Sequence, residues 1–195
     1  MSSDILSEHK AMTDKGLDAL FEGARPHNTQ GMLVRLANYL QLASEAPNLS
    51  EAELNETRAR QVFFAVKESF EHYAEMHNHA FNDMKAALRD DNTSDEARDL
   101  DTVCQGLRRV LNRLAHRCVH AADLWAIAHA ALLAARAQHL GAQRAAAPDG
   151  ATAAQIENDA ELARAAADKL RTPAMRRAWA DERLLEYGLP SRPPA

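Results

Sequence analysis

Two consecutive stretches of the chain, residues 50–91 and 93–140, contain no proline and a single glycine, Gly106. Proline and glycine are the residues that most disfavour a helix interior, so both stretches are free to form long helices. Apolar residues recur in both at alternating steps of three and four, the 3.5-residue repeat by which long helices pack along one seam. The seam residues are Phe63, Val66, Phe70, Tyr73, His77, Ala80 and Met84 in the first stretch and Leu100, Val103, Leu107, Val110, Leu114, Ala121 and Leu124 in the second. This pattern predicts a long antiparallel helical hairpin that resembles a coiled coil.

The rest of the chain also carries helix signals, and the whole reads as an all-α bundle of about six helices. Ser50 and Thr172 have the spacing of helix N-caps, and Gly141 is a natural helix end. Gly106 and residues 116–123 are the points at which a long helix is expected to kink. Further helices are predicted at residues 3–23, 29–45, 152–170 and 172–188. We therefore expect a bundle over residues 1–141 built on the hairpin 50–140, a linker at 142–151, a C-terminal helical pair at 152–188 and a mobile tail at 189–195.

Composition limits the class of function. The net charge of −5 argues against a general nucleic-acid binder, which needs a basic surface. The chain has no Gly-rich nucleotide motif and no nucleophile motif, which favours a non-enzymatic protein. Its abundant alanine and arginine suggest a GC-rich bacterial genome.

The cysteines and the N-terminus suggest a cytoplasmic location. Cys104 and Cys118 lie about 21 Å apart on one predicted helix, too far for a disulfide. We expect neither a Sec signal peptide nor a transmembrane helix, although a non-Sec export route stays open. Residues 118–135 are apolar, but they include His120, Asp123 and His129, which favours a buried bundle helix.

Two groups of histidines and acids give an alternative function, divalent-metal binding. His116 and His120 are four residues apart, a spacing that can chelate a transition metal, and Asp123 follows three residues later. His72, Glu75 and His79 form the second group. The expected hairpin register places the two groups about three helical turns apart, so they can join one site only if a helix breaks or another subunit contributes.

A basic stripe on the second long stretch gives the third hypothesis. Arg109, Arg113 and Arg117 repeat every four residues and so share one helix face. They are expected to form ion pairs with Glu68, Glu71 and Glu75 on the neighbouring helix, or to bind an anionic membrane surface.

The favoured interpretation is an interaction module that binds a protein partner or self-associates. No cofactor is expected. Trp, Tyr and Arg dominate the energetics of protein interfaces, so the residues expected to contact the partner are Arg109, Arg113, Arg117, Trp125, Trp179 and Tyr39.

Overall fold

The computed structural model describes residues 29–42, 47–90, 95–147 and 150–192. Within them the chain is helical and contains no strand, which confirms the all-α class. The helix predicted at residues 3–23 lies outside the described residues. The helices are α2 (Thr29–Leu42), α3 (Leu49–Asp90), α4 (Asp95–Ala146), α5 (Ala151–Asp168) and α6 (Pro173–Glu186).

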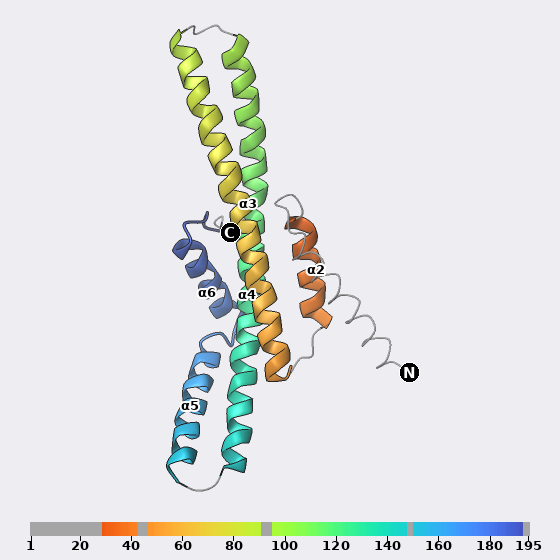
Figure 1. Cartoon of the computed structure of the whole chain (residues 1–195), viewed down its shortest axis with the longest axis vertical. Coiled ribbons are helices and arrows are strands. Elements are labelled where there is room, and N and C mark those ends of the chain that lie inside the picture. Colours follow the sequence, from red (N-terminus) through yellow and green to blue (C-terminus); the bar gives the residue numbers. More distant parts are fainter. Residues whose placement is uncertain (1–28, 43–46, 91–94, 148–149, 193–195) are drawn as a thin grey trace, which may run out of the picture.

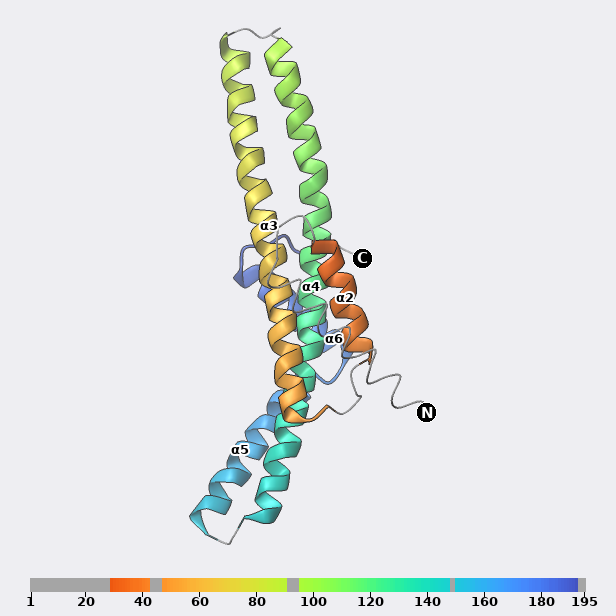
Figure 2. The ribbon, with the colours of Figure 1, turned by 45° about the vertical axis from the view of Figure 1, so that its right-hand side comes forward.

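The two long helices dominate the architecture, and they pack against each other as expected. α3 has 42 residues and α4 has 52. At 1.5 Å per residue these are roughly 63 and 78 Å long. They lie side by side, and the chain reverses direction between them (Figures 1 and 2). Both are unbroken at the points where the sequence suggests a kink. Gly106 is exposed and a methyl group there would meet no other atom, so it costs only its helix propensity, about 1 kcal/mol.

The beginnings of α3 and α6 show how short-range hydrogen bonds set helix ends. α3 begins one residue before Ser50, the predicted cap. The cap is Asn48 instead, whose Oδ1 accepts the backbone N–H of Glu51 at 2.9 Å. α6 begins as predicted, because Thr172 Oγ1 accepts the N–H of Met175 at 3.2 Å. Asparagine is as strong an N-cap as serine, so the residue that precedes the helical turn takes the role.

α4 does not end at Gly141. The helix passes through this glycine and ends at Ala146, so the predicted linker at 142–151 is reduced to a short connection. A single glycine costs about 1 kcal/mol, and the alanines that follow it favour the helix. α5 packs against this part of α4, and Arg144 lies 3.6 Å from Glu157 across the contact. Tertiary packing thus extends α4 beyond its local stop signal.

The core lies where α2 and α6 cover the middle of the α3–α4 pair from opposite sides (Figures 1 and 2). α5 and α6 both pack on α4, so the C-terminal helices dock on the long pair. Predicted seam residues of both long helices, Phe63 and Leu124 among them, are buried there, but Val103 farther along α4 is 50% exposed, so the predicted seam is wrong at that position. The buried core includes Leu33, Leu36, Phe63, Val66, Cys118, Ala121, Trp125, Ala180 and Leu184.

Beyond this core the two long helices continue alone as a projecting arm (Figure 1). We define the arm as residues 71–90 of α3 and 95–112 of α4. Among the described side chains of the arm, the buried ones are all small: Ala80, Ala97 and Cys104. Three large apolar side chains remain substantially exposed: Met76 by 43%, Leu88 by 42% and Val103 by 50%. The arm therefore has a thin seam and leaves apolar surface in water.

Candidate functional site

The histidine group on α3 lies on the arm. His72, Glu75 and His79 are all exposed there, and His72 makes an edge-on ring contact with Tyr73 at 5.5 Å. The second group lies on α4, beside the core rather than on the arm. Within the described residues no three or more His, Cys, Asp or Glu side chains are arranged to hold a metal ion. The two groups are separate in space, as the expected register requires.

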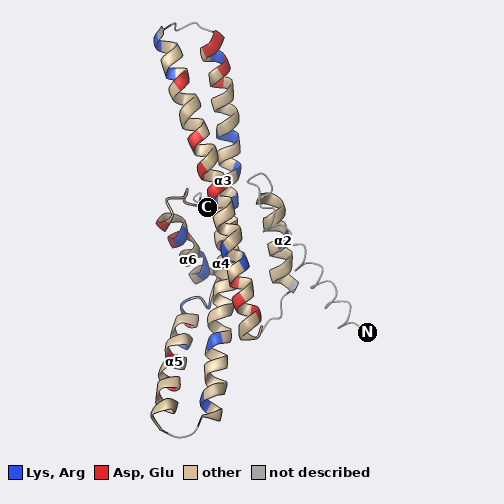
Figure 3. Ribbon diagram, in the orientation of Figure 1, with Lys and Arg blue, Asp and Glu red and all other residues tan. Residues whose placement is uncertain are grey.

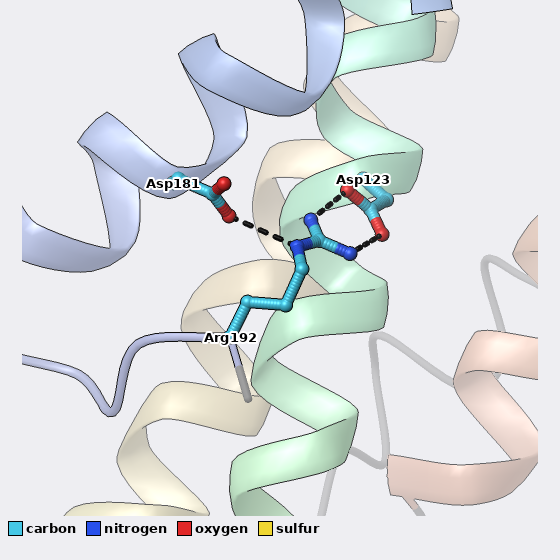
Figure 4. Close-up of polar contacts among 3 residues, drawn as sticks. All are labelled: Asp123, Asp181 and Arg192. Carbon is cyan, nitrogen blue, oxygen red and sulfur yellow. Dashed lines mark hydrogen bonds and ion pairs between the residues drawn. The ribbon is translucent and has the colours of Figure 1, made fainter. Parts of the chain in front are cut away.

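Asp123, one of the predicted metal ligands, is held by an arginine from the end of the chain. Arg192 Nη2 and Nη1 donate to its two carboxylate oxygens at 2.6 and 3.0 Å (Figure 4). Arg192 Nε also donates to Asp181 of α6 at 3.1 Å. The hydrogen bond to Asp123 raises the pKa of Arg192 further. A bidentate guanidinium occupies the oxygens that a metal would need.

Arg192 belongs to the segment predicted as a mobile tail, so residues 189–192 correct that prediction. Gly188 adopts a positive φ of 64°, which reverses the chain after α6. Leu189 N–H then donates to the carbonyl of Leu184 at 2.9 Å, and the Leu189 side chain is buried. This helix-end motif returns the chain to the core and brings Arg192 to α4.

Two arginines of the stripe, Arg113 and Arg117, line one shallow groove between α2 and α4 together with His116 and His120. The groove has a volume of about 440 Å³, and none of the described residues that line it is acidic. Arg117 Nη1 donates to Thr29 Oγ1 of α2 at 2.9 Å. The lining residues are Gln30, Leu33, Arg113, His116, Arg117 and His120. We call this the basic groove.

The expected ion pairs between the stripe and α3 do not form within the described residues. Glu71 pairs instead with Lys67 on its own helix, at 2.7 Å. Arg109 is exposed on the arm, and Arg113 is exposed at the basic groove. Figure 3 shows basic residues along the middle of α4 and acidic residues along the adjacent part of α3.

Two of the aromatic residues expected to contact a partner are part of the core. Tyr39 is 1% exposed and Trp125 is 6% exposed. The indole Nε1 of Trp125 donates to Glu56 Oε1 at 2.8 Å, and the guanidinium of Arg58 lies over the Tyr39 ring at 4.9 Å. These side chains anchor the chain's own helices, which corrects the prediction that they contact a partner.

Trp179, the third predicted aromatic anchor, is half-buried and packs around a histidine that the sequence did not single out as a site. His129 stacks on Trp179 with ring centroids 5.0 Å apart, and Trp179 meets Trp125 edge-on at 5.2 Å. His129 Nδ1 lies 3.6 Å from Glu56 Oε1, too far for a hydrogen bond. Burial lowers the pKa of His129, and the charge of Glu56 opposes this effect. The imidazole is therefore held in its neutral form beside a carboxylate.

A shallow apolar depression of about 590 Å³ lies beside this histidine, between α4, α5 and α6. Leu133, Leu170 and Met175 line it together with His129 and Trp179. No sequence motif predicts this arrangement, because its residues belong to three helices and are far apart in the sequence.

Among the described helices, α4 is long and apolar enough to cross a membrane by length and composition, and 44% of its apolar window is buried inside the chain. A core helix passes the same test, and this part of α4 supplies much of the core.

Searches against family models, curated proteins and solved structures found no match for this chain.

Proposed function

We propose that this protein is a non-enzymatic interaction module, an antiparallel helical hairpin within a bundle, and that its arm pairs with the arm of a second copy. The observation that carries the proposal is the composition of the arm: small residues inside, with Met76, Leu88 and Val103 more than two-fifths exposed. Two hairpins that pack face to face would form a four-helix bundle and cover this surface. Burying a side chain of this size contributes about 1.5–3 kcal/mol.

The size of the arm supports a stable pair. Twenty residues of helix extend roughly 30 Å, and two adjacent helices are roughly 20 Å wide. A face of this size buries on the order of 600 Å² on each copy, which exceeds in total the roughly 1,000 Å² expected of a specific interface.

Charge supports a second copy as the partner. Glu75 on α3 and Arg109 on α4 are both exposed. Glu56 and Trp125 are hydrogen-bonded across the two helices, and Glu75 lies 19 residues after Glu56 while Arg109 lies 16 residues before Trp125, so the two charges are within about one helical turn of each other along the hairpin. In a two-fold pair each contact occurs twice, so Glu75 of one copy can meet Arg109 of the other, and the reverse. Within the described residues neither side chain is engaged in an ion pair of its own.

The test is sedimentation velocity over a range of protein concentrations, with Met76→Glu and Val103→Glu as arm variants. The wild type should shift from monomer to dimer as concentration rises, and each arm variant should remain monomeric. Leu185→Glu is the matched control, since Leu185 is 80% exposed on α6, away from the arm. A wild type that is monomeric throughout would overturn the proposal.

Charge reversal separates pairing from a general loss of solubility. Glu75→Arg and Arg109→Glu should each weaken the dimer, because like charges then oppose each other. The double variant should restore it, since both pairs are re-formed with their signs exchanged. Equal dimerisation in all four proteins would contradict the proposed orientation.

A further inference from the structure

The basic groove concentrates positive charge on a chain whose net charge is −5. The two arginines, Arg113 and Arg117, are four residues apart on α4, as are the two histidines, His116 and His120, so all four share one face over roughly 10 Å. Gln30 of α2 supplies an amide on the opposite wall, and Leu33 supplies an apolar floor. The groove therefore presents several hydrogen-bond donors within a small volume.

These donors are largely available for a ligand. Arg113 and both histidines are exposed, with no hydrogen bond or ion pair to other described residues. Arg117 uses one nitrogen, Nη1, for Thr29 and keeps its remaining N–H groups. The nearest acid along α4, Asp123, is already neutralised by Arg192. Nothing in the described lining of the groove offsets its positive charge.

We infer that the basic groove is a binding site for a phosphate group. A guanidinium matches the geometry of phosphate oxygens in a two-pronged hydrogen bond, and two guanidinium groups one helical turn apart can hold one phosphate between them. The imidazole N–H groups of His116 and His120 and the amide of Gln30 add donors to the remaining oxygens. A phosphate has more acceptor oxygens and more charge than a carboxylate, and so uses more of these donors. The inference is independent of the arm and of self-association.

The phosphate can belong to a soluble molecule or to a lipid headgroup, and the experiment separates the two. One arm titrates the full-length protein with inorganic pyrophosphate in a calorimeter, at low and at moderate ionic strength. The other measures co-sedimentation with vesicles of phosphatidylcholine alone and of phosphatidylcholine with phosphatidic acid. Binding to pyrophosphate identifies a soluble ligand, and binding to the acidic vesicles alone identifies a headgroup.

Variants assign the binding to the groove. Arg113→Gln should weaken binding about tenfold, equivalent to roughly 1.4 kcal/mol. His116→Gln should weaken it less, because an imidazole presents fewer N–H donors than a guanidinium. Arg136→Gln, at another exposed arginine of α4, is the matched control and should bind like the wild type. Circular dichroism checks that all three proteins remain helical.

Two results would overturn the inference. The first is no binding to either pyrophosphate or acidic vesicles at low ionic strength. The second is binding that Arg113→Gln and Arg136→Gln reduce equally, since this would reflect overall charge rather than the groove. Arg117→Gln is a further variant, for which thermal stability is measured as well as binding. It should lower stability because the hydrogen bond from Arg117 to Thr29 is lost, whereas Arg113→Gln removes a donor of the groove and no such bond.

Discussion

At the scale of single residues, the centre of the molecule is organised by Glu56. Its carboxylate accepts a hydrogen bond from the indole of Trp125 at 2.8 Å and lies 3.6 Å from Nδ1 of His129. Trp179 covers the face of the same imidazole. This packing buries most of the His129 side chain, and the loss of solvation outweighs the attraction of the carboxylate, so the pKa of His129 is lowered. A histidine whose pKa is lowered on folding makes the folded state sensitive to acid.

We expect the free energy of unfolding to fall as the pH decreases below about 6.5. The folded state keeps His129 neutral, whereas the unfolded chain binds a proton at its ordinary pKa, so acid favours unfolding. His129→Gln removes this group, and its stability should depend less on pH between about 7.5 and 5. Urea unfolding at a series of pH values measures the slope.

His139→Gln is the control for this prediction, because His139 is an exposed histidine on the same helix. It should keep the wild-type pH dependence. If His129→Gln and the wild type lose stability in parallel as the pH falls, another group is responsible and the assignment to His129 is wrong.

The residue scale is also where sequence reasoning about the site reached its limit. It found the basic residues of the groove, because Arg113, Arg117 and the histidines share a helix face by spacing alone. It missed the bond between Arg192 and Asp123, since 69 positions separate the two residues and no periodicity links them. It also placed Trp125 at an interface. Tryptophan is enriched both in interfaces and in cores because its large ring favours burial, so the residue type alone does not distinguish the two locations.

At the scale of the elements, the start of α3 provides a discriminating test. Asn48→Ala should lower the free energy of unfolding by about 1 kcal/mol, because the N–H of Glu51 loses its acceptor. Ser50→Ala should change it by less than about 0.5 kcal/mol, since Ser50 lies inside the helix and is exposed. Chemical denaturation of the two variants measures the difference. A larger loss of stability in Ser50→Ala than in Asn48→Ala would identify Ser50 as the N-cap of α3, as the sequence predicts.

The elements themselves were largely predictable, and the reason is their length. A seam that repeats over about ten helical turns leaves little ambiguity, so both long helices were found within a few residues except at the end of α4. The end of α4 was wrongly predicted at Gly141. A glycine in a helix costs only about 1 kcal/mol, and the packing of α5 on α4, which the local sequence does not reveal, favours a longer helix. The docking of α5 and α6 was likewise beyond a local pattern, because an alanine-rich face does not specify which helix it meets.

At the scale of the whole molecule, the core and the arm differ in how much apolar surface they bury. In the middle, four helices surround a core that contains Phe63 and Trp125, whose rings lie 5.1 Å apart. In the arm, two helices share a seam in which the buried described residues are alanines and a cysteine. Burial of apolar area is the main source of folding free energy, so the arm has much less of it per residue than the core. Local opening is therefore expected to begin in the arm.

Hydrogen exchange measured by mass spectrometry tests this division and connects it to the proposed pairing. At low protein concentration, peptides from residues 71–90 and 95–112 should exchange faster than peptides from residues 56–70 and 114–129, because opening the arm exposes little apolar surface. At high concentration a second copy covers the arm, so exchange should slow there and stay unchanged in the core. The Met76→Glu variant should exchange at the fast rate at both concentrations. An arm as protected as the core at the lowest concentration would mean that the thin seam is sufficient by itself, and the case for a partner on this surface would fall.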